Sequence, residues 1–288
     1  MFYRLMFSAL CVFAAMKVEA DQSPAYVLDI QGEGPPVYFI PGLASPGSVW
    51  DDLAAEMRAM GHQTRVLTLA GFAGISPIDG ETFLPIVHRQ LADELAGLEG
   101  EPPLLIGHSL GGFMALWLGA TNSEHLAGII AIDGVPYLGA LADASATPES
   151  NRTGAEQLEA FMASLSAEQY STQNRMALSG MITDPDDVER FAEVSGRSEP
   201  STVGRAVAEM LTTDLRPLMH QVTVPVVLIQ AADSGASEGG FGAFAMQVAD
   251  IPEVRHVVAN QGRHFVQIDD PDFVLKEVQA LLDGLGHE

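Results

Sequence analysis

Short apolar segments alternate with longer amphipathic segments along most of this 288-residue chain. Segments such as Leu104–Ile106 and Ile129–Ile132 are apolar throughout, which is typical of strands that are buried on both faces. The longer segments repeat apolar residues at helical spacing. This alternation predicts an α/β fold with a mostly parallel central sheet flanked by helices. The predicted strands are Tyr26–Ile30, Val37–Ile40, Thr64–Leu69, Leu104–Ile106, Ile129–Ile132, Val226–Ile229 and Arg255–Val258, and the predicted core helices are Val49–Met60, Phe83–Leu98, Leu110–Ala120 and one near Phe273–Leu282.

A segment without convincing strands interrupts the alternation between residues 137 and 217. Its apolar residues recur at helical spacing, and we expect most of them to pack within the segment. Because methionine adapts to varied apolar ligands, a few of these side chains can line a cavity beneath the segment. We therefore expect one core, built from residues 21–136 and 218–288, and a helical insertion over 137–217. The predicted helices of the insertion are Ala155–Ser164, Ala167–Gly180, Pro185–Ser195 and Ser201–Thr212.

The first 20 residues have the pattern of a secretory signal peptide. Arg4 supplies a positive charge, residues 5–16 form an apolar run, and Val18 and Ala20 occupy the positions that signal peptidase recognises. The run is too short to span a bilayer, so we expect no stable membrane insertion rather than an uncleaved anchor. Cleavage near Ala20 would export the protein to the periplasm or the extracellular space. Because Cys11 is the only cysteine, the mature chain would have neither a catalytic thiol nor a disulfide.

The net charge restricts the possible partners. Lys and Arg together number 14 and Asp and Glu number 38, which gives a formal charge of −24. A field of this sign repels polyanions, so we expect no nucleic acid partner and no anionic membrane surface. The 47% apolar content is high enough for a folded core and excludes a disordered chain.

The segment Gly107–Gly111, which reads Gly-His-Ser-Leu-Gly, carries the strongest chemical signal. It follows the apolar run Leu104–Ile106 directly and precedes a helical pattern. A strand that turns this sharply into a helix holds Ser109 in a strained conformation, and only small neighbours such as Gly107 and Gly111 fit there. The turn exposes the serine hydroxyl beside the free N–H groups of the helix N-terminus, as a nucleophile requires.

With this motif in its strand–turn–helix context, the mature chain resembles the α/β-hydrolase superfamily, in the form that carries an inserted helical cap. The resemblance implies that Ser109 is the nucleophile and that two backbone N–H groups form the oxyanion hole. One donor would be Leu110, and the other would be Leu43 in the segment Tyr38–Leu43. Family members usually have His-Gly in that segment where this chain has Pro41-Gly42. Because the donor is a backbone group, loss of the histidine does not by itself abolish the hole.

The resemblance also identifies the base. His264 lies in a loop after the last predicted strand, where superfamily members place the catalytic histidine, and it fits the chain order Ser, Asp, His. His108, beside the nucleophile, is expected to pack or to line the pocket. The remaining histidines share no ligand spacing, so we expect no metal site. No dinucleotide-binding fingerprint occurs either, and we expect no cofactor.

Two aspartates are candidates for the acid that orients the base. Asp233 ends the predicted strand Val226–Ile229 and its turn, the region where the family usually keeps this residue, and we take it as the expected acid. Asp133 follows the preceding strand, from which a minority of the superfamily draws its acid, and it is the alternative. The aspartate that does not orient the base would have a structural role, as a capping residue or in a turn.

These residues predict an exported serine hydrolase that cleaves carboxylic esters through an acyl-enzyme intermediate. The expected substrate is a small uncharged acyl or aryl ester. The same triad could instead serve an aminopeptidase, a lactonase, a C–C bond hydrolase or a cofactor-free perhydrolase. A non-enzymatic binding module is disfavoured because serine, base and acid are all present. An aminopeptidase would need acidic residues to hold the substrate ammonium, and the candidates in the insertion are Glu156, Glu159, Asp186, Asp187 and Glu189.

Overall fold

The computed structural model describes residues 23–80, 82–233 and 240–286, and the predicted signal peptide lies outside them. Within these residues the strands form one seven-stranded sheet in the order β1-β3-β2-β4-β5-β6-β7. Only β1 runs antiparallel to its neighbour; every other pair is parallel, as the apolar runs predicted. The strands are β1 Tyr26–Gln31, β2 Pro36–Ile40, β3 Gln63–Leu69, β4 Leu104–His108, β5 Gly128–Ile132, β6 Val226–Ala231 and β7 Val254–Ala259.

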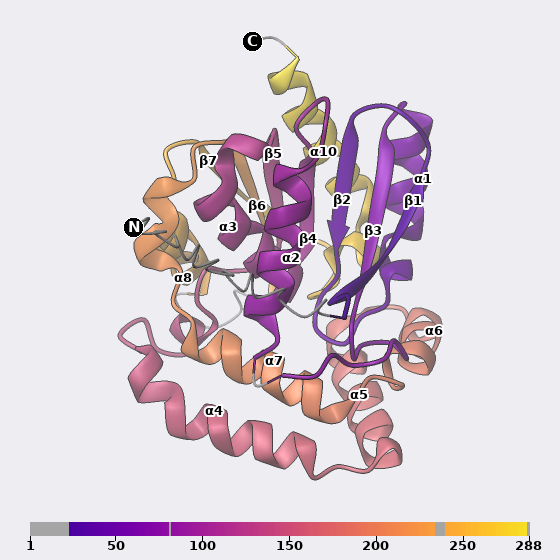
Figure 1. The fold of residues 1–288 in the computed structure, drawn as a ribbon, viewed down its shortest axis with the longest axis vertical. Coiled ribbons are helices and arrows are strands. Elements are labelled where there is room, and N and C mark those ends of the chain that lie inside the picture. The colour runs from indigo at the N-terminus through magenta and orange to yellow at the C-terminus, as the bar shows by residue number, and fades with distance from the viewer. Residues whose placement is uncertain (1–22, 81, 234–239, 287–288) are drawn as a thin grey trace, which may run out of the picture.

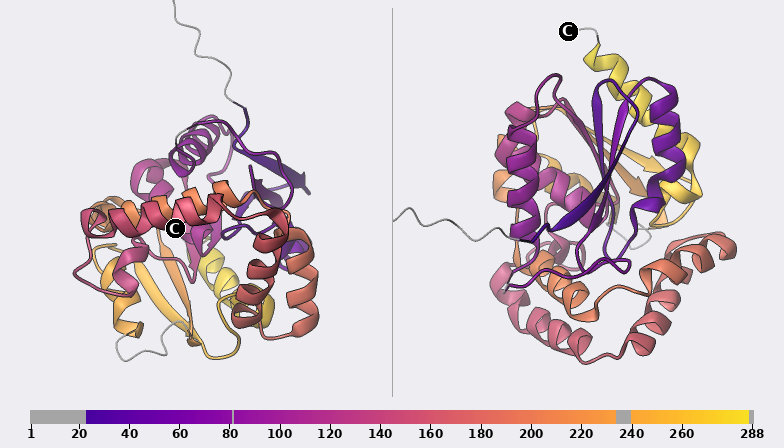
Figure 2. Two further views of the ribbon diagram at one scale, coloured as in Figure 1. Left: turned by 90° about the horizontal axis from the view of Figure 1, so that it is seen from below. Right: turned by 45° about the vertical axis from the view of Figure 1, so that its right-hand side comes forward.

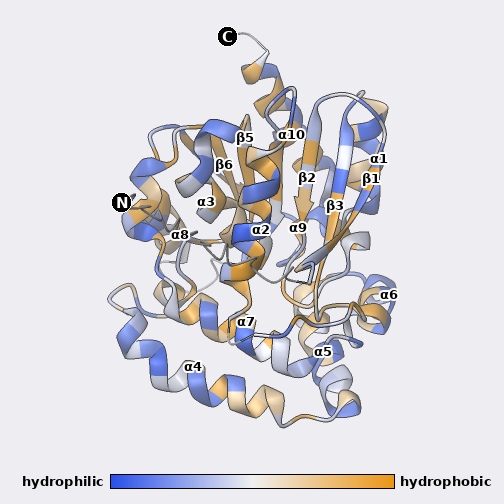
Figure 3. Cartoon of the chain, viewed as in Figure 1, coloured by the Kyte–Doolittle hydropathy of each residue, from blue (hydrophilic) through white to orange (hydrophobic). Residues whose placement is uncertain are grey.

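Helices cover both faces of the sheet (Figure 1). Successive side chains of a strand point to opposite faces of the sheet. In β2, Tyr38 packs with helices α2 (Leu84–Ala96) and α3 (Leu110–Asn122), whereas Phe39 packs with α1 (Asp51–Ala59) and α10 (Pro271–Leu285). Figure 3 shows the resulting apolar strands between helices of mixed polarity. The α-helices are α1 Asp51–Ala59, α2 Leu84–Ala96, α3 Leu110–Asn122, α4 Pro148–Ala163, α5 Ala167–Met181, α6 Pro185–Ser195, α7 Pro200–Thr212, α8 Gly240–Val248, α9 Val266–Asp269 and α10 Pro271–Leu285.

Helices α4 to α7 form the insertion between β5 and β6. They cross one end of the sheet, the end at which the parallel strands finish, and leave its two faces to the other helices (Figures 1 and 2). Three of these helices begin within one residue of their predicted starts. Helix α4 begins seven residues earlier than predicted, because Thr147 and Ser150 form a reciprocal capping box there. No helix among the described residues is long and apolar enough to cross a membrane.

A polar network fastens the antiparallel edge strand to the rest of the sheet. The Glu94 carboxylate on α2 accepts hydrogen bonds from Tyr26 of β1 at 2.6 Å and from Tyr38 of β2 at 2.7 Å. Arg65 of β3 donates to the Tyr38 hydroxyl at 2.9 Å and pairs with Glu94 at 3.2 Å. Burial and the adjacent carboxylate raise the pKa of both tyrosines well above its usual range, so both hydroxyls remain donors. One partly buried carboxylate therefore joins three strands and a helix.

Replacing this carboxylate should destabilise the fold. We expect Glu94→Gln to lower the free energy of unfolding by about 1–3 kcal/mol, because hydrogen bonds to a charged acceptor are lost. Urea unfolding measures the change. The matched control is Glu124→Gln, whose side chain is 71% exposed and should cost less than about 0.5 kcal/mol. Equal effects of the two substitutions would contradict the role assigned to the network.

Candidate active site

Ser109 occupies the tight turn between β4 and α3. Its backbone angles, φ 53° and ψ −116°, lie in a region that residues other than glycine rarely adopt. The chain passes so close to itself here that a Cβ on Gly107 would overlap the carbonyl oxygen of Gly111. The Ser109 N–H donates to the carbonyl of Ile132 at 2.8 Å, which ties the turn to the end of β5. The expected elbow is therefore formed, and it holds the serine in a strained, defined position.

His264 and Asp133 lie against each other beyond the same sheet edge. His264, in the loop after β7, donates from Nδ1 to Asp133 Oδ2 at 2.5 Å, and the Asp133 side chain is only 1% exposed. The other carboxylate oxygen, Oδ1, accepts a hydrogen bond from the N–H of Ala231 at 3.0 Å. Asp133 also has a positive φ of 48°. With Nδ1–H facing the carboxylate, Nε2 of His264 carries the lone pair that a general base uses.

The expectation that Asp233 orients the base is wrong. Its side chain is 65% exposed, and its Oδ2 lies 3.8 Å from Nε of Arg263. Asp133 follows β5 directly and remains at the sheet edge, whereas Asp233 is two residues beyond the end of β6, where the chain has already turned toward solvent. The chain beside Asp133 is tightly packed, because a Cβ on Gly134 would lie 2.6 Å from the carbonyl oxygen of Ser109.

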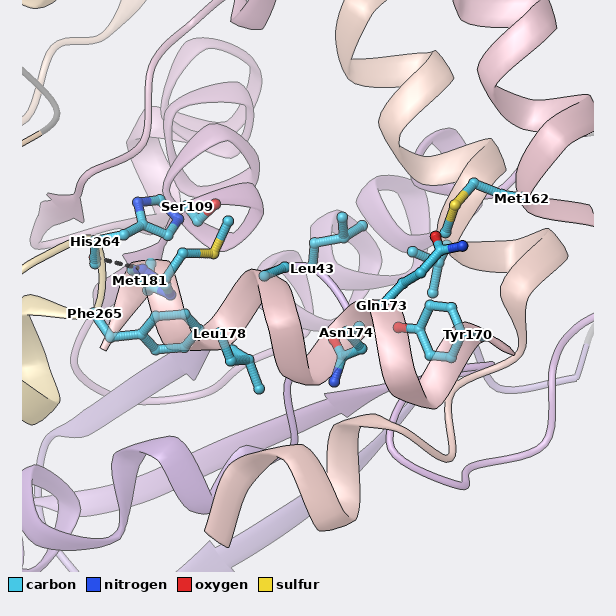
Figure 4. A pocket seen from close by; sticks show the side chains of 14 residues that line it. Leu43, Ser109, Met162, Tyr170, Gln173, Asn174, Leu178, Met181, His264 and Phe265 are labelled. Atoms are coloured by element: carbon cyan, nitrogen blue, oxygen red, sulfur yellow. Dashed lines mark hydrogen bonds between the residues drawn. The ribbon is translucent and has the colours of Figure 1, made fainter. Parts of the chain in front are cut away.

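His108 is fully buried and contacts His264. Its Nε2–H donates to the carbonyl oxygen of His264 at 2.9 Å (dashed in Figure 4), and its ring centroid lies 4.6 Å from that of His264. Burial lowers the pKa of His108 well below its usual value, and the nearby His264 ring lowers it further. His108 therefore stays neutral with its proton on Nε2. Its ring packs against the rings of His264 and Phe265, and it also lines the cavity, in agreement with both expected roles.

A turn after β2 lies close to Ser109. The turn spans Gly42–Ser45, closed by a hydrogen bond of 3.1 Å from the Ser45 N–H to the Gly42 carbonyl. A Cβ on Gly42 would lie 2.8 Å from Nδ1 of His108 and 3.3 Å from Cβ of Ser109. Residue 42 must therefore lack a side chain for this turn to lie so close to Ser109, and Leu43 lines the same cavity as the serine. Leu110 begins α3, so its N–H has no partner within the helix and is available beside Ser109.

The insertion also contacts this turn through a residue that the sequence did not single out. Ser198, between α6 and α7, is 4% exposed, and its hydroxyl lies 3.2 Å from the carbonyl oxygen of Ala44. The Ser198 hydroxyl oxygen also accepts a hydrogen bond from the N–H of Ala73 at 2.8 Å. Ala44 has a φ of 58°, so the turn is strained where Ser198 reaches it. The insertion therefore helps to fix the position of the turn.

A cavity of about 300 Å³ lies between the sheet edge and the insertion. Ser109 and His264 share one end of it, and side chains of α4, α5 and α7 complete its walls (Figure 4). Neither an acidic side chain nor Lys or Arg is among the lining residues in the described part of the chain. The lining residues are Leu43, Ala44, His108, Ser109, Met162, Tyr170, Gln173, Asn174, Ala177, Leu178, Met181, Val203, His264 and Phe265.

The described residues contain no group of three His, Cys, Asp or Glu side chains that could hold a metal ion. The chemistry that the arrangement itself offers is nucleophilic: a strained serine and a histidine whose orientation is fixed by a buried carboxylate, at the end of an apolar cavity.

Comparison with known proteins agrees with this geometry. The 2-(acetamidomethylene)succinate hydrolase of Mesorhizobium japonicum is 23% identical over 273 residues, which cover 88% of this chain and 90% of that protein. The enol-lactonase from Burkholderia xenovorans LB400 superposes with a TM-score of 0.73 at 16% identity, over 90% of this chain and 96% of that chain. A thermophilic esterase from Thermogutta terrifontis gives 0.70 at 20% identity, over 90% and 93%. At these identities the two solved structures are evidence of the fold alone.

The model of the Alpha/beta hydrolase family matches residues 37–277, which include both strands and helices of the core and the whole insertion. The match extends over most of the chain, and the sheet order and the elbow agree with it. This chain belongs to the alpha/beta hydrolase family and is a hydrolase.

Proposed function

We propose that the protein is a serine hydrolase that cleaves uncharged carboxylic esters, with Ser109 as nucleophile, His264 as base and Asp133 as the orienting acid. The observation that carries the proposal is the hydrogen bond of 2.5 Å between His264 Nδ1 and the buried Asp133, beside a serine on a strained turn in the same cavity. The pairing of His264 with Asp133, together with Ser109 on the wall of the same cavity as His264, supports these three roles.

The reaction begins when Ser109 Oγ attacks the ester carbonyl and Nε2 of His264 takes the hydroxyl proton. The Asp133 carboxylate stabilises the imidazolium, and the N–H groups of Leu43 and Leu110 donate to the oxyanion. The tetrahedral intermediate then collapses: the ester C–O bond breaks, and His264 returns its proton to the departing alcohol. Water hydrolyses the resulting acyl-Ser109 by the same steps, with His264 again as base.

The walls of the cavity support a neutral substrate. No charged side chain is among its lining residues in the described chain, so a carboxylate or an ammonium group would find no opposite charge there. The formal charge of −24 adds repulsion against anions. The acidic residues that an aminopeptidase would need, from Glu156 to Glu189, are not among the lining residues either, which favours an ester over a peptide with a free amino group.

We also propose that the insertion acts as a cap over the reacting carbonyl. This proposal is supported by the six α5 residues in the cavity wall.

We further propose that the mature protein acts outside the cytoplasm. This proposal is supported by the apolar run at residues 5–16 and by the signal peptidase pattern that ends at Ala20. Mass spectrometry of the secreted protein tests it, because cleavage should leave Asp21 as the first residue.

Removing the nucleophile should abolish turnover. We expect Ser109→Ala to lower kcat for a 4-nitrophenyl ester by about 10⁶-fold, as loss of a triad nucleophile does, with an unchanged melting temperature. Steady-state assays with wild type and variant measure the loss, and circular dichroism confirms the fold. Residual turnover within about tenfold of wild type would mean that the nucleophile is a different residue.

The two aspartates should differ sharply. Asp133→Asn keeps the size of the side chain but removes the charge that orients His264 and stabilises the imidazolium, so kcat should fall by about 10⁴-fold. Asp233→Asn is the matched control, and its exposed position predicts a change of less than about threefold. Small losses in both variants, or a deep loss only in Asp233→Asn, would contradict the assignment of the acid.

The turn after β2 should be sensitive to a single methyl group. In Gly42→Ala the new Cβ would press on His108 and Ser109 and move the Leu43 N–H away from the oxyanion. We expect kcat to fall by about 10²-fold, with KM changed little, because the donor acts mainly in the transition state. Gly154→Ala is the control, since a Cβ there meets no atom within 4 Å. An unchanged kcat in Gly42→Ala would exclude Leu43 as a donor.

A further inference from the structure

One face of helix α5 forms the long wall of the cavity. Its lining residues are spaced three and four apart, so they make a single stripe along the helix. The first and last are 11 residues apart, which corresponds to about 16 Å along the axis. Figure 4 shows Met181 at the end near Ser109 and Tyr170 at the opposite end. The residues of the stripe are Tyr170, Gln173, Asn174, Ala177, Leu178 and Met181.

The chemistry of the stripe changes along its length. Met181, Leu178 and Ala177 are apolar and lie on the side of the reacting serine, whereas the far end carries one phenol and two amides. The volume of about 300 Å³ corresponds to roughly ten water-sized groups. Spread along about 16 Å of helix α5, this volume holds one unbranched carbon chain but not two side by side. Two chains would need more width, because the atoms of neighbouring carbon chains lie 3.5–4.0 Å apart.

Asn174 presents a fixed acceptor at the far end. Its Nδ2 donates to the hydroxyl of Ser195 at 2.6 Å, and that hydroxyl donates its only proton to the carbonyl of Phe191 at 2.8 Å. Ser195 can therefore only accept from Asn174, which fixes the amide with Oδ1 directed away from Ser195. Ser195 is 3% exposed, so water does not compete for this contact. The buried serine sets the orientation of an amide on the cavity wall.

We propose that Asn174 determines specificity by accepting, at Oδ1, a hydrogen bond from a neutral hydroxyl or amide N–H at the far end of a linear ester. The inference rests on the proposed function, since it requires the ester carbonyl at Ser109. Asn174 is seven residues from Met181, about 10 Å along α5. An extended chain advances about 1.2 Å per bond, so about eight bonds separate the carbonyl from the donor. This length agrees with the number of groups that the volume holds.

We take the donor to be neutral. A protonated amine could also donate to Asn174, but it would have no ionic partner, because no carboxylate is among the residues that line the described cavity. A carboxylate offers no proton to Oδ1. The class of substrate that fits is therefore an ester with an apolar chain that ends in a hydroxyl or an amide.

Two series of esters test the proposal. The first contains 4-nitrophenyl esters of ω-hydroxy acids with about four to ten carbons, each compared with the methyl-ended ester of equal size. The second contains acetates of linear diols and of the matching alkanols, which places the chain on the alcohol side. In one series wild type should prefer the hydroxyl-ended ester by about tenfold in kcat/KM, most strongly near eight carbons. The series that shows the preference identifies the side of the ester on which the chain lies.

Substitution of Asn174 should remove this preference. In Asn174→Leu the ratio of kcat/KM for the hydroxyl-ended ester to that for the methyl-ended ester should fall to twofold or less, because the hydroxyl loses its acceptor. Ser195→Ala frees the amide to rotate and should reduce the ratio in part, which provides a second test if Asn174→Leu is poorly folded. Thr172→Leu, at an exposed position of the same helix, is the control and should retain the full ratio.

The outcomes separate this inference from the proposed function. A wild-type preference that persists in Asn174→Leu and in Ser195→Ala would overturn the role of Asn174, and so would an active wild type without any preference. Failure to hydrolyse every ester in both series would overturn the proposed function as well.

Discussion

Close backbone packing at the carboxyl ends of β2, β4 and β5 is the constraint on which the site depends. Gly42 approaches Ser109 so closely that a Cβ would lie 3.3 Å from the serine Cβ, and Gly134 is held near the Ser109 carbonyl in the same way. Because no side chain separates these segments, the turn that contains Leu43 and the segment that contains Asp133 both lie close to Ser109. The order of the parallel strands brings their ends together, and the glycines allow the final approach.

Much of the site could be predicted because it follows from single strands. A nucleophile that follows an apolar strand and precedes a helix is visible in the sequence, and so is a histidine in the loop after the last strand. The acid was not predictable in this way, since Asp133 and Asp233 follow neighbouring strands. Which of the two contacts His264 depends on the path of the chain after each strand. Asp133 directly follows β5, whereas Asp233 lies two residues beyond the end of β6 and is exposed to solvent.

The walls of the cavity were harder to predict than its catalytic end. Helical spacing divides each helix of the insertion into faces but does not say which face turns toward the sheet. Met162 and Met181 line the cavity, whereas Met176 on the same helix as Met181 is 69% exposed. The contacts of Asn174 with Ser195 depend on two helices whose residues are 21 positions apart, and no local pattern encodes such a pairing.

The account depends most directly on the claim that Ser109 forms the covalent bond to the substrate. Brief incubation of the full-length protein with a fluorophosphonate, followed by peptide mass spectrometry, locates the modified residue. The account predicts one adduct per chain, on the peptide that contains Ser109, and loss of esterase activity in proportion to labelling. An adduct on a different residue, or full activity after complete labelling of Ser109, would contradict it.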